Sequence, residues 1–240
     1  MIPNDNHNSW IEFINDRCVK CILKDIEEKI VTDYTPKNNV LRFLTTDLSK
    51  IKVVILGQDP YPQEGVATGR AFEIGDKKSW CEPIKQTSLI NIIKSIYKTY
   101  HDEDVEKMDI SQIREEIKVG KFKINRLIKD WFDNLEKQGV LFLNTAFTCE
   151  IDRPNSHSDI WKDFTEKLIS HIVKKRPDCI WFIWGDDAEN VVENYQTIKK
   201  IKCCHPRLYS FVNTNKSFAA TQNTNQKSEV KINWLGTQSV

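Results

Sequence analysis

Apolar residues recur along this 240-residue chain with two spacings, and segments of the two kinds alternate. Short, uninterrupted apolar runs predict buried β-strands, whereas longer stretches with apolar residues three and four positions apart predict helices that bury one face. Apolar runs predict strands at 52–56, 140–143 and 179–184, and a fourth strand is predicted at 198–204, where lysines interrupt the apolar residues. The stretches that predict helices are an N-terminal segment at about 8–32, with its apolar spacing between Trp10 and Val31, and 87–100, 125–138, 159–175, 186–195 and 217–226.

This order of strands and helices is typical of an α/β fold. We expect residues 1–240 to form a single three-layer α/β/α domain around a central, mostly parallel, four-stranded sheet. Thr87 or Ser88 is suited to cap the helix that begins there. The polar and charged stretch at about 101–123 interrupts the pattern, and we expect it to be a surface insertion.

Polar side chains follow the predicted strands. Asp59 lies just past the first strand, Asn144 ends the second, and Asp186 and His205 follow the third and the fourth. Crossovers between parallel strands are right-handed, so the carboxyl ends of the strands meet at one edge, where ligands bind in α/β sheets. We therefore expect an acid, an amide and an imidazole to converge at that edge.

Each of these residues also has an ordinary structural explanation, as a helix cap, a loop brace or a packed imidazole. The proline after Asp59 stiffens the backbone and favours an extended acid, which suits a carboxylate that must hold one position. The Asn144 amide can pair with an amide–imide edge, and His205 can donate a hydrogen bond or exchange a proton. With Phe72 as a stacking surface and Tyr61 as a wall, the set describes a pocket for a small planar heterocycle.

The composition limits the partners and the location that we expect. A net charge of +1 gives no bulk attraction to nucleic acid, although it permits a local basic face. The mean hydropathy is −0.50, and no apolar run approaches the roughly 20 residues of a membrane span, so no membrane partner is expected. The first residues lack the basic start and apolar core of a secretory signal, so we expect a cytoplasmic protein, with nucleoid-associated activity if bacterial.

The cysteines and the missing nucleotide motifs argue against a resident metal or cofactor. An odd count of seven cysteines cannot form a complete set of disulfides. Cys18 and Cys21 form a CxxC pair, without the second pair that a structural zinc or an iron–sulfur cluster usually requires. We expect reduced, mostly buried thiols, with metal binding as the less favoured alternative. The chain also lacks a P-loop, a GxGxxG fingerprint and a GxSxG hydrolase elbow.

Several short motifs, taken in order, resemble those of family 1 uracil-DNA glycosylases. They are GQDPYP at 57–62, ATGRAF at 67–72, LFLNTAFT at 141–148, WFIWGDDA at 181–188 and HPRLYSF at 205–211. The similarity runs from about residue 51 to KINW near 234, and NSHSDIWKDFTEKLI resembles the helix that follows the asparagine motif of that family. The resemblance implies an enzyme that flips uracil out of double- or single-stranded DNA and hydrolyses the bond between base and sugar, without a metal or organic cofactor.

The resemblance also implies roles for individual residues. Asp59 would orient the attacking water and stabilise the cationic sugar, and His205 would donate a hydrogen bond to a uracil oxygen as negative charge develops there. Asn144 would read the uracil edge, and Phe72 would stack on the base. The other implied positions are Gln58 for backbone contacts to uracil, Tyr61 to exclude the thymine methyl group, and Lys85, Ser88, Arg207, Leu208, Tyr209 and Ser217 for contacts with DNA.

Departures from the family pattern modify these expectations. Pro62 stands where the family usually has a water-positioning histidine, so we expect a slower chemical step. Arg207 replaces a serine that contacts phosphate in the family. Tyr209 aligns with the family's leucine wedge, although Leu208 takes that place if the loop is shifted. The loop at 85–88 lacks the family's prolines, so we expect softer compression of the DNA backbone.

Two other functions stay open beside the glycosylase. One is a DNA- or partner-binding protein of low activity on the same fold, which Pro62 and the altered DNA-facing loops favour. The other is a glycosylase with an altered base preference, against which Tyr61 and Asn144 argue. We expect a monomer, because the enzyme must enclose a duplex, and a proteinaceous glycosylase inhibitor is a second candidate partner beside DNA.

Overall fold

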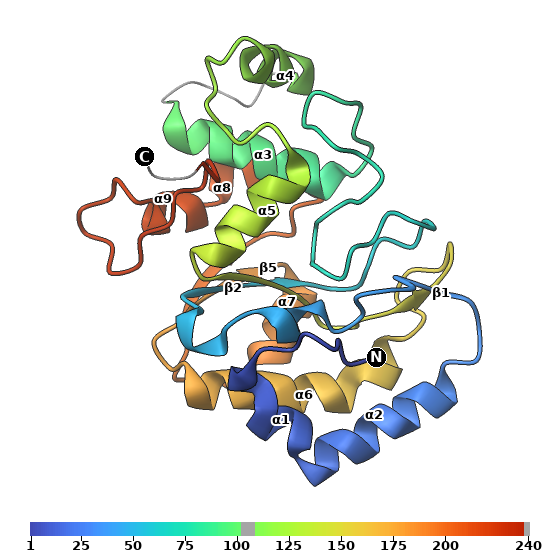
Figure 1. The fold of residues 1–240 in the computed structure, drawn as a ribbon. Coiled ribbons are helices and arrows are strands. Elements are labelled where there is room, and N and C mark those ends of the chain that lie inside the picture. Colours follow the sequence, from blue (N-terminus) through green and yellow to red (C-terminus); the bar gives the residue numbers. More distant parts are fainter. Residues whose placement is uncertain (102–108, 238–240) are drawn as a thin grey trace.

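A four-stranded parallel sheet forms the centre of the computed structural model, which describes residues 1–101 and 109–237 (Figure 1). Its strands lie in the order β3 (Val140–Asn144), β2 (Val53–Gly57), β5 (Ile180–Trp184) and β6 (Lys199–Cys203). Every neighbouring pair in this sheet is parallel, so the predicted α/β fold with a mostly parallel four-stranded sheet is confirmed. Each predicted strand is present, and no bound is shifted by more than one residue.

The central strands are buried on both faces, which explains their unbroken apolar sequences. All residues of β2 and of β3 are buried. Successive side chains point to opposite faces of a sheet, so Val53 and Ile55 join one core whereas Val54 and Leu56 join the other. A single short apolar run therefore contributes to two cores at once.

Helices cover both faces of the sheet and complete three layers (Figure 1). One core joins the sheet to α3 (Thr87–Tyr100), α4 (Ile110–Lys118), α5 (Ile128–Lys137), α8 (Phe211–Thr214) and α9 (Ser217–Thr221). The other core joins it to α1 (Ile11–Asn15), α2 (Arg17–Lys29), α6 (Ser158–Lys175) and α7 (Asp186–Val192). Short 3-10 helices, η1 (Asn8–Trp10), η2 (Arg42–Thr45) and η3 (Leu48–Lys50), precede β2 in the chain. No helix in residues 1–101 or 109–237 combines the length and the apolar character needed to cross a bilayer.

The N-terminal helix and the cap of α3 differ from the prediction, although α3 spans Thr87–Tyr100 as predicted. The N-terminal helix is broken at Asp16, whose carboxylate accepts hydrogen bonds from the N–H groups of the second and third residues of α2. The N-cap of α3 is Gln86, which makes no capping hydrogen bond through its side chain. The predicted cap at Thr87 or Ser88 is therefore wrong, since both residues lie inside the first turn.

Three helices are shorter than predicted. α7 ends at Val192 rather than at 195, and in α5 and α9 the chain leaves the helix to make tertiary contacts. α5 starts at Ile128 rather than at 125, since Asn125 donates its backbone N–H to a carbonyl of the C-terminal segment. α9 ends at Thr221 rather than at 226, since Gln222 is extended and forms a bridge with the same segment.

A second, two-stranded sheet was not predicted. Strands β1 (Tyr34–Thr35) and β4 (Cys149–Glu150) are antiparallel, and they tie the loop before η2 to the chain just after β3. Strands of two residues are too short to show a periodic pattern, so the sequence carries no signal for them.

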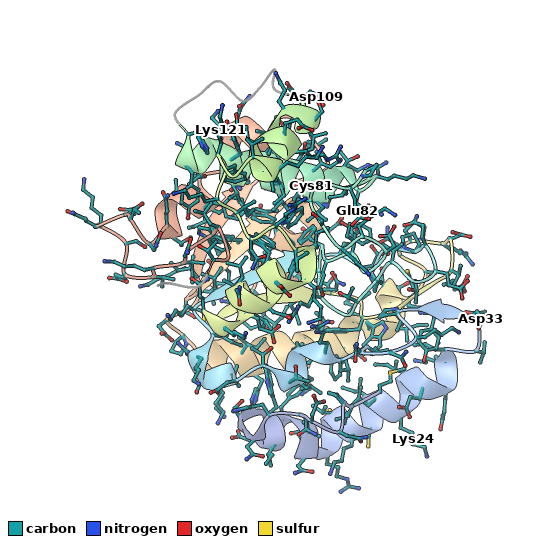
Figure 2. The ribbon with its side chains drawn as sticks, turned by 45° about the horizontal axis from the view of Figure 1, so that its top comes forward. Lys24, Asp33, Cys81, Glu82, Asp109 and Lys121 are labelled. Carbon is teal, nitrogen blue, oxygen red and sulfur yellow. The ribbon has the colours of Figure 1, made fainter. Side chains whose placement is uncertain are left out.

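The predicted surface insertion at about 101–123 is partly core. Residues 102–108 lie outside the described residues, but α4 packs on α3. The segment buries Ile113, Ile117 and Phe122. Charged side chains such as Asp109 and Lys121 stay on the outside (Figure 2). The segment is thus a surface insertion whose short helix and few apolar residues also extend one core.

The cysteines only partly fit the prediction of buried thiols. All seven are free. Cys149 and Cys179 are buried, whereas Cys18 and Cys21 are exposed on α2. The prediction of burial is therefore wrong for the CxxC pair.

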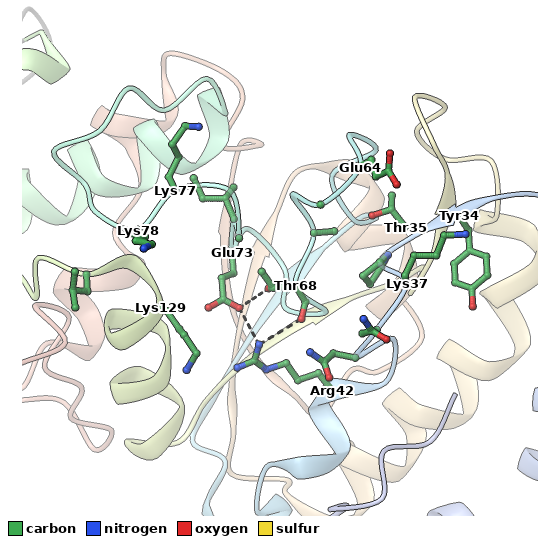
Figure 3. Close-up of a pocket in the computed structure, with 18 of the residues that line it drawn as sticks. Tyr34, Thr35, Lys37, Arg42, Glu64, Thr68, Glu73, Lys77, Lys78 and Lys129 are labelled. Atoms are coloured by element: carbon green, nitrogen blue, oxygen red, sulfur yellow. Dashed lines mark hydrogen bonds and ion pairs between the residues drawn. The ribbon is translucent and has the colours of Figure 1, made fainter.

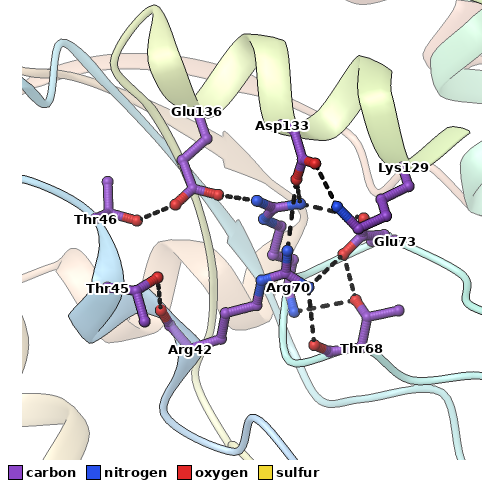
Figure 4. A network of polar contacts seen from close by, with 9 residues as sticks. All are labelled: Arg42, Thr45, Thr46, Thr68, Arg70, Glu73, Lys129, Asp133 and Glu136. Carbon is purple, nitrogen blue, oxygen red and sulfur yellow. Dashed lines mark hydrogen bonds and ion pairs between the residues drawn. The ribbon is translucent and has the colours of Figure 1, made fainter. Parts of the chain in front are cut away.

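A network of charged side chains fixes the loop between β2 and α3 against α5 (Figure 4). Glu73, which is only 1% exposed, pairs with Arg70 at 3.2 Å and with Arg42 at 3.4 Å. Arg70 also pairs with Asp133 at 2.8 Å and with Glu136, both on α5. The loop, η2 and α5 are thus held together by charges that are largely withdrawn from water.

Buried charges stabilise a fold only while each keeps its partner. Removing one partner leaves an uncompensated charge and destabilises by about 3–5 kcal/mol, although the intact pair adds little net stability. Burial opposes ionisation of Asp133, but hydrogen bonds from Lys129 and Arg70 outweigh it and hold the pKa of Asp133 below its ordinary value. The stability that ionised Asp133 contributes is therefore present above its unfolded pKa and is lost as pH falls through its lower folded pKa.

Replacing Arg70 with methionine should lower the free energy of unfolding by about 3–5 kcal/mol at neutral pH, because Glu73 then keeps the more distant Arg42 as its cationic partner and otherwise only the neutral Thr68 hydroxyl. Urea denaturation followed by circular dichroism measures the loss. Lys129→Met is the matched control, since Lys129 is exposed and its pair with Asp133 should contribute about 1 kcal/mol or less. Equal losses in the two variants would contradict the role given to the buried charges.

Candidate active site at the carboxyl edge of the sheet

The site begins at Gly57, the last residue of β2, which pairs in register with Asn144 of β3. A Cβ atom at Gly57 would lie 2.5 Å from Asn144 Oδ1, 2.8 Å from the Ala71 Cβ and 3.6 Å from the Phe72 ring. Real Cβ atoms do not make contacts under 3.0 Å, so this position requires glycine. Because Gly57 has no side chain, the Asn144 amide and the Phe72 ring can both lie close to the end of β2.

Asn144 presents its amide at this point. The residue is 4% exposed, and its side chain makes no hydrogen bond within residues 1–101 and 109–237. An amide without a protein partner at this place can pair with a ligand through one acceptor and two donors. The position of Asn144 is compatible with its predicted role in reading a planar polar edge.

Phe72 is held in a strained backbone conformation beside Asn144. Its φ is 65°, in the left-handed region that residues other than glycine seldom adopt and that often marks functional sites. Arg70 and Glu73, both anchored in the charge network, flank it in the chain (Figure 4). The centroid of its ring lies 5.8 Å from that of Trp184. The charge network thus supplies the constraint that keeps this ring in place.

Ser217 was predicted to contact DNA, which requires an exposed side chain, but the residue is not on the surface. It is 0% exposed, and its hydroxyl accepts a hydrogen bond from the Trp184 indole at 3.2 Å. The Trp184 ring in turn contacts Phe72. The predicted phosphate contact of Ser217 is therefore wrong, and the residue instead orients the ring behind the proposed stacking surface.

Asp59 follows β2 and is held by the backbone of a distant segment. Its Oδ2 accepts a hydrogen bond from the Asn155 N–H at 2.7 Å. Burial raises the pKa of Asp59, the N–H groups of Asn155 and of Asp59 itself partly offset this, and the Asp187 carboxylate adds to the rise. A carboxylate that is fixed in position but poorly solvated interacts strongly with a positive charge that forms beside it.

The turn that follows Asp59 is braced by the segment that begins with β4. The Pro62 carbonyl accepts a hydrogen bond from the Asp152 N–H at 2.9 Å. The Pro60 carbonyl accepts one from the Cys149 thiol at 3.5 Å. Pro62 lacks an imidazole, but its backbone takes part in the hydrogen bonds that make the turn rigid.

Tyr61 and Gln58 complete this side of the site. The Tyr61 hydroxyl is buried and has no hydrogen-bond partner among the described residues. Burial raises the pKa of Tyr61, so its phenol stays neutral. The Gln58 carbonyl accepts hydrogen bonds from the Thr145 N–H at 3.1 Å and the Ala146 N–H at 2.9 Å, which ties this loop to the end of β3.

His205 follows β6 and packs against the backbone of Gly185. Gly185 has a φ of 92°, and a Cβ atom there would lie 2.9 Å from the His205 Cβ. The Arg207 N–H donates to His205 Nδ1 at 3.0 Å, so Nδ1 is an acceptor and a neutral ring carries its proton on Nε2. Burial lowers the pKa of His205 more than Asp187 raises it, which favours this neutral form.

The loop after His205 carries the residues predicted to face DNA. Asn91, buried in α3, donates to the carbonyls of Pro206 at 2.7 Å and Leu208 at 3.3 Å. Leu208 and Tyr209 are 53% and 55% exposed, so two adjacent large side chains extend from a loop with a fixed backbone. Of the predicted phosphate contacts, Lys85 and Arg207 are exposed and Ser88 is half-buried.

Sequence reasoning missed four residues that shape the site, namely Gly57, Asn91, Asn155 and Asp187. A polar residue at 91 inside an otherwise apolar helix face is a signal that the sequence does contain. Gly57 and Asn155 act through the backbone, which no pattern of side chains reveals. Asp187 raises the pKa of both Asp59 and His205, so its charge acts on both.

One cavity lies beside these residues, and a larger one lies away from them. A cavity of about 520 Å³ adjoins the site between α6 and α7, and Gln58, Thr145 and Asp187 contribute to its lining. A larger cavity of about 640 Å³ opens between the loop near Tyr34 and the start of α5, with four lysines around it (Figure 3). No predicted site residue lines the larger cavity, so size alone does not identify the site in this protein.

The structure is thus an α/β protein whose parallel sheet carries a carboxylate, an imidazole, an amide and an aromatic ring beyond its strand ends. Residues 45–229 match the Uracil DNA glycosylase superfamily. The chain belongs to this superfamily, as its motifs predicted.

Relatives of known name extend over most of the chain. A uracil-DNA glycosylase of Fusobacterium nucleatum is 30% identical over 98% of this chain and 94% of its own. One from Mesomycoplasma hyopneumoniae is 28% identical over 94% of this chain and 97% of its own. One from Escherichia coli is 30% identical over 85% of this chain and 82% of its own.

Crystal structures of two similar proteins share the fold. UNG from Nitratifractor salsuginis has a TM-score of 0.69 at 21% identity, over 88% of each chain. A variant of mimivirus UNG, solved in complex with UGI, has a TM-score of 0.57 at 22% identity, over 83% of this chain and 70% of its own. At these identities the likeness shows the fold alone.

The hydrogen bond to Nδ1 predicts the protonation state of His205. At pH 7 its ring should be neutral, with the proton on Nε2, and its pKa should lie below the ordinary 6.5. Nitrogen-15 NMR of histidine-labelled protein, recorded from acid to neutral pH, measures both properties, and His205→Gln identifies the resonance. A ring that is charged at neutral pH, or that carries its proton on Nδ1, would contradict the geometry.

Proposed function

We propose that this protein removes uracil from DNA by hydrolysing the N-glycosyl bond, and that Asp59 and His205 carry the chemistry. The observation that supports this most is the meeting of Asn144 and Phe72 at Gly57, at the same sheet edge as the two reactive groups. A base that is flipped out of a duplex offers a flat ring and a polar edge to such a pocket. The protein is then a monofunctional DNA-repair hydrolase that leaves an abasic site.

Asp59 acts on the sugar side of the bond. As the bond breaks, the sugar gains oxocarbenium character, which a fixed carboxylate stabilises. The Asn155 N–H holds one carboxylate oxygen, and the other orients the attacking water. Because burial raises the pKa of Asp59, its charge is poorly solvated before the reaction and gains most when the cation forms.

His205 and Asn144 act on the base. With Nδ1 occupied by the Arg207 N–H, the neutral ring donates from Nε2 to the uracil oxygen on which negative charge develops. Asn144 pairs with a carbonyl and an N–H of uracil, whereas cytosine offers mismatched groups and leaves a buried amide unpaired. Phe72 stacks on the ring, and Tyr61 occupies the space that a thymine methyl group would need.

The loop between β6 and α8 positions the DNA. The exposed Arg207 and Lys85, with Ser88 in the first turn of α3, contact phosphates. Leu208 or Tyr209 fills the gap that the flipped base leaves. Hydrogen bonds from α3 hold the backbone of this loop, so the wedge has less freedom to lose when it enters the duplex.

The remaining parts of the proposal concern rate, partners and location. Pro62 slows the chemical step without abolishing it, because the braced turn still fixes Asp59. The protein acts as a cytoplasmic monomer on double- or single-stranded DNA, and the proposed chemistry needs no metal or organic cofactor. A proteinaceous inhibitor is a further candidate partner, since a similar UNG was solved in complex with UGI.

The deciding test is base release from labelled oligonucleotides that carry uracil, thymine or hypoxanthine, as single strands and as duplexes. We expect strand cleavage by alkali only after treatment of the uracil substrates. Folded protein that cleaves none of them would support a DNA- or partner-binding role. Release of hypoxanthine in place of uracil would support an altered base preference.

Asp59→Asn should lower the rate of uracil release by about 10²–10⁴-fold, because the water and the sugar cation lose their anion. The same change should raise the free energy of unfolding at neutral pH. A carboxyl group whose pKa rises on folding destabilises the folded state above that pKa, and the amide removes this effect. Single-turnover kinetics and urea denaturation measure the two changes, and a variant that is both inactive and less stable would indicate misfolding instead.

Asn144→Asp should release cytosine detectably, because a carboxylate accepts a hydrogen bond from the cytosine amino group. Release of uracil should fall by about 10–10²-fold, which corresponds to roughly 1–3 kcal/mol for one paired edge. Paired assays on uracil and cytosine oligonucleotides measure the ratio. Asn223→Asp, at an exposed position, is the control for added charge, and an unchanged base preference in Asn144→Asp would remove this residue from recognition.

A further inference from the structure

Cys203 and Cys204 form an adjacent pair of thiols at the end of β6, directly before His205. Adjacent side chains of an extended strand point to opposite faces, which keeps neighbouring thiols apart. Here β6 ends at Cys203, and the two sulfur atoms lie only 4.0 Å apart. Both residues are half-buried, and both thiols are free. The chain thus holds a close dithiol beside a residue of the proposed active site.

Hydroxyl groups from the following segment surround the two sulfur atoms. Thr214 Oγ1, in α8, lies 3.3 Å from the Cys203 Sγ and 3.6 Å from the Cys204 Sγ. Ser210 Oγ lies 3.4 Å from the Cys204 Sγ. The Thr214 hydroxyl donates its proton to the Ser210 carbonyl at 2.9 Å, so towards the two sulfur atoms it is an acceptor. The Ser210 hydroxyl can donate to the Cys204 Sγ, and such a hydrogen bond stabilises the thiolate form.

The two thiols therefore differ in reactivity. Burial opposes ionisation of Cys204, but hydrogen bonds at its sulfur atom, first that with the Ser210 hydroxyl, outweigh it and lower the pKa of Cys204. Burial raises the pKa of Cys203, which keeps its proton. A thiol of lowered pKa within 4.0 Å of a second thiol has the arrangement that favours reversible oxidation.

We propose that Cys203 and Cys204 are a site of reversible oxidation by a hydroperoxide, that the product is a disulfide between these adjacent residues, and that the oxidised protein has little glycosylase activity. The effect on activity rests on the proposed function, whereas formation of the disulfide does not.

The oxidation proceeds in two balanced steps. The Cys204 thiolate attacks one oxygen of hydrogen peroxide and becomes a sulfenic acid, while the O–O bond breaks and the other oxygen leaves as hydroxide, which takes up a proton to become water. The Cys203 thiol then attacks the sulfenic sulfur, an S–S bond forms, and the hydroxyl group leaves with the thiol proton as water. Two thiols lose two electrons, and one peroxide is reduced to two waters.

The geometry of adjacent residues makes this disulfide easy to reduce. Their Cα atoms are about 3.8 Å apart across a trans peptide, closer than the roughly 4.4–6.8 Å of ordinary disulfides. Ring closure therefore strains or rotates the intervening peptide, and strained disulfides have the higher reduction potentials of labile, regulatory bonds. A dithiol reductant should restore both thiols.

The strain of ring closure falls on the residue that precedes His205. Cys203 is fixed in β6, where its carbonyl accepts a hydrogen bond from the Gly185 N–H at 2.9 Å. Cys204 must therefore turn, and His205 follows it. The imidazole packs against Gly185 and accepts the Arg207 N–H at 3.0 Å, so a rotation of the backbone disturbs both contacts.

Mass spectrometry tests the covalent step directly. Lys202 precedes the pair and Arg207 follows it, so trypsin releases the peptide CCHPR. After treatment with hydrogen peroxide and alkylation without reduction, we expect this peptide to be unalkylated and two hydrogen atoms lighter than the dithiol. Dithiothreitol should restore two alkylatable thiols. A peptide that keeps both thiols, or that carries sulfinic acid without any disulfide, overturns the proposal.

Activity assays test the consequence. Peroxide should lower uracil release by wild-type protein on the order of 10²-fold, as expected when a catalytic group is displaced by about 1 Å, and dithiothreitol should restore it. Cys203→Ser retains the reactive thiol but cannot close the ring, so it should keep its activity under peroxide. The double variant Cys18→Ser/Cys21→Ser, altered only at the exposed pair on α2, should respond as wild type does.

The outcomes separate this site from the proposed function. A disulfide that forms without any change in uracil release overturns the regulatory role. Equal inactivation of Cys203→Ser and wild-type protein assigns the loss to another residue and overturns it as well. If the reduced wild-type protein is inactive from the start, the proposed function fails, and the mass of the CCHPR peptide still decides the oxidation site.

Discussion

The site depends on the absence of a side chain at Gly57. Because β2 and β3 are parallel and in register, Gly57 and Asn144 stand opposite each other, and a Cβ atom at Gly57 would come within 2.5 Å of the Asn144 amide oxygen. Only a hydrogen atom fits there. Gly185 at the end of β5 does the same for His205, whose Cβ would lie 2.9 Å from a Cβ at Gly185. Close approaches of the backbone, rather than adjustable side chains, therefore set the positions of the Asn144 amide, the Phe72 ring and the His205 imidazole.

Charged groups are paired in the scaffold around Phe72 but poorly solvated at the sheet edge. Arg70 and Glu73 belong to a network in which buried cations and anions are paired, and this network holds Phe72 at its strained φ of 65° (Figure 4). At the sheet edge, burial raises the pKa of Asp59 and lowers that of His205. Paired charges make the scaffold rigid, and poorly solvated groups stay available for a charge that develops in the reaction. The stability of the scaffold thus supports a site that is itself destabilising.

Hydrogen bonds from distant parts of the chain hold the segments beyond the strand ends, and except for the bond to the Asp59 carboxylate they are accepted by backbone carbonyls of those segments. Asn155 and Asp152 brace the turn that carries Asp59 and Pro62, and Asn91 holds the loop that carries Tyr209. Bonds to backbone groups tolerate changes in the side chains of the loop itself. The backbone of these loops is therefore held although Pro62 and Arg207 depart from the family pattern, and a pair of adjacent cysteines is accommodated directly before His205.

The amino-acid sequence was sufficient to predict the sheet, the edge of the sheet near the candidate site residues, and the protein family. Short apolar runs that are buried on both faces leave little freedom in where a strand begins or ends, and the right-handed crossover rule brings Asp59, Asn144 and His205 to one edge. Three features became visible only in the folded structure. Ser217 is buried under Trp184, α4 has a core face, and the sulfur atoms of Cys203 and Cys204 lie 4.0 Å apart. These features depend on contacts between segments far apart in the chain or on the turn of an irregular loop, and neither leaves a periodic pattern in the sequence from which it can be predicted.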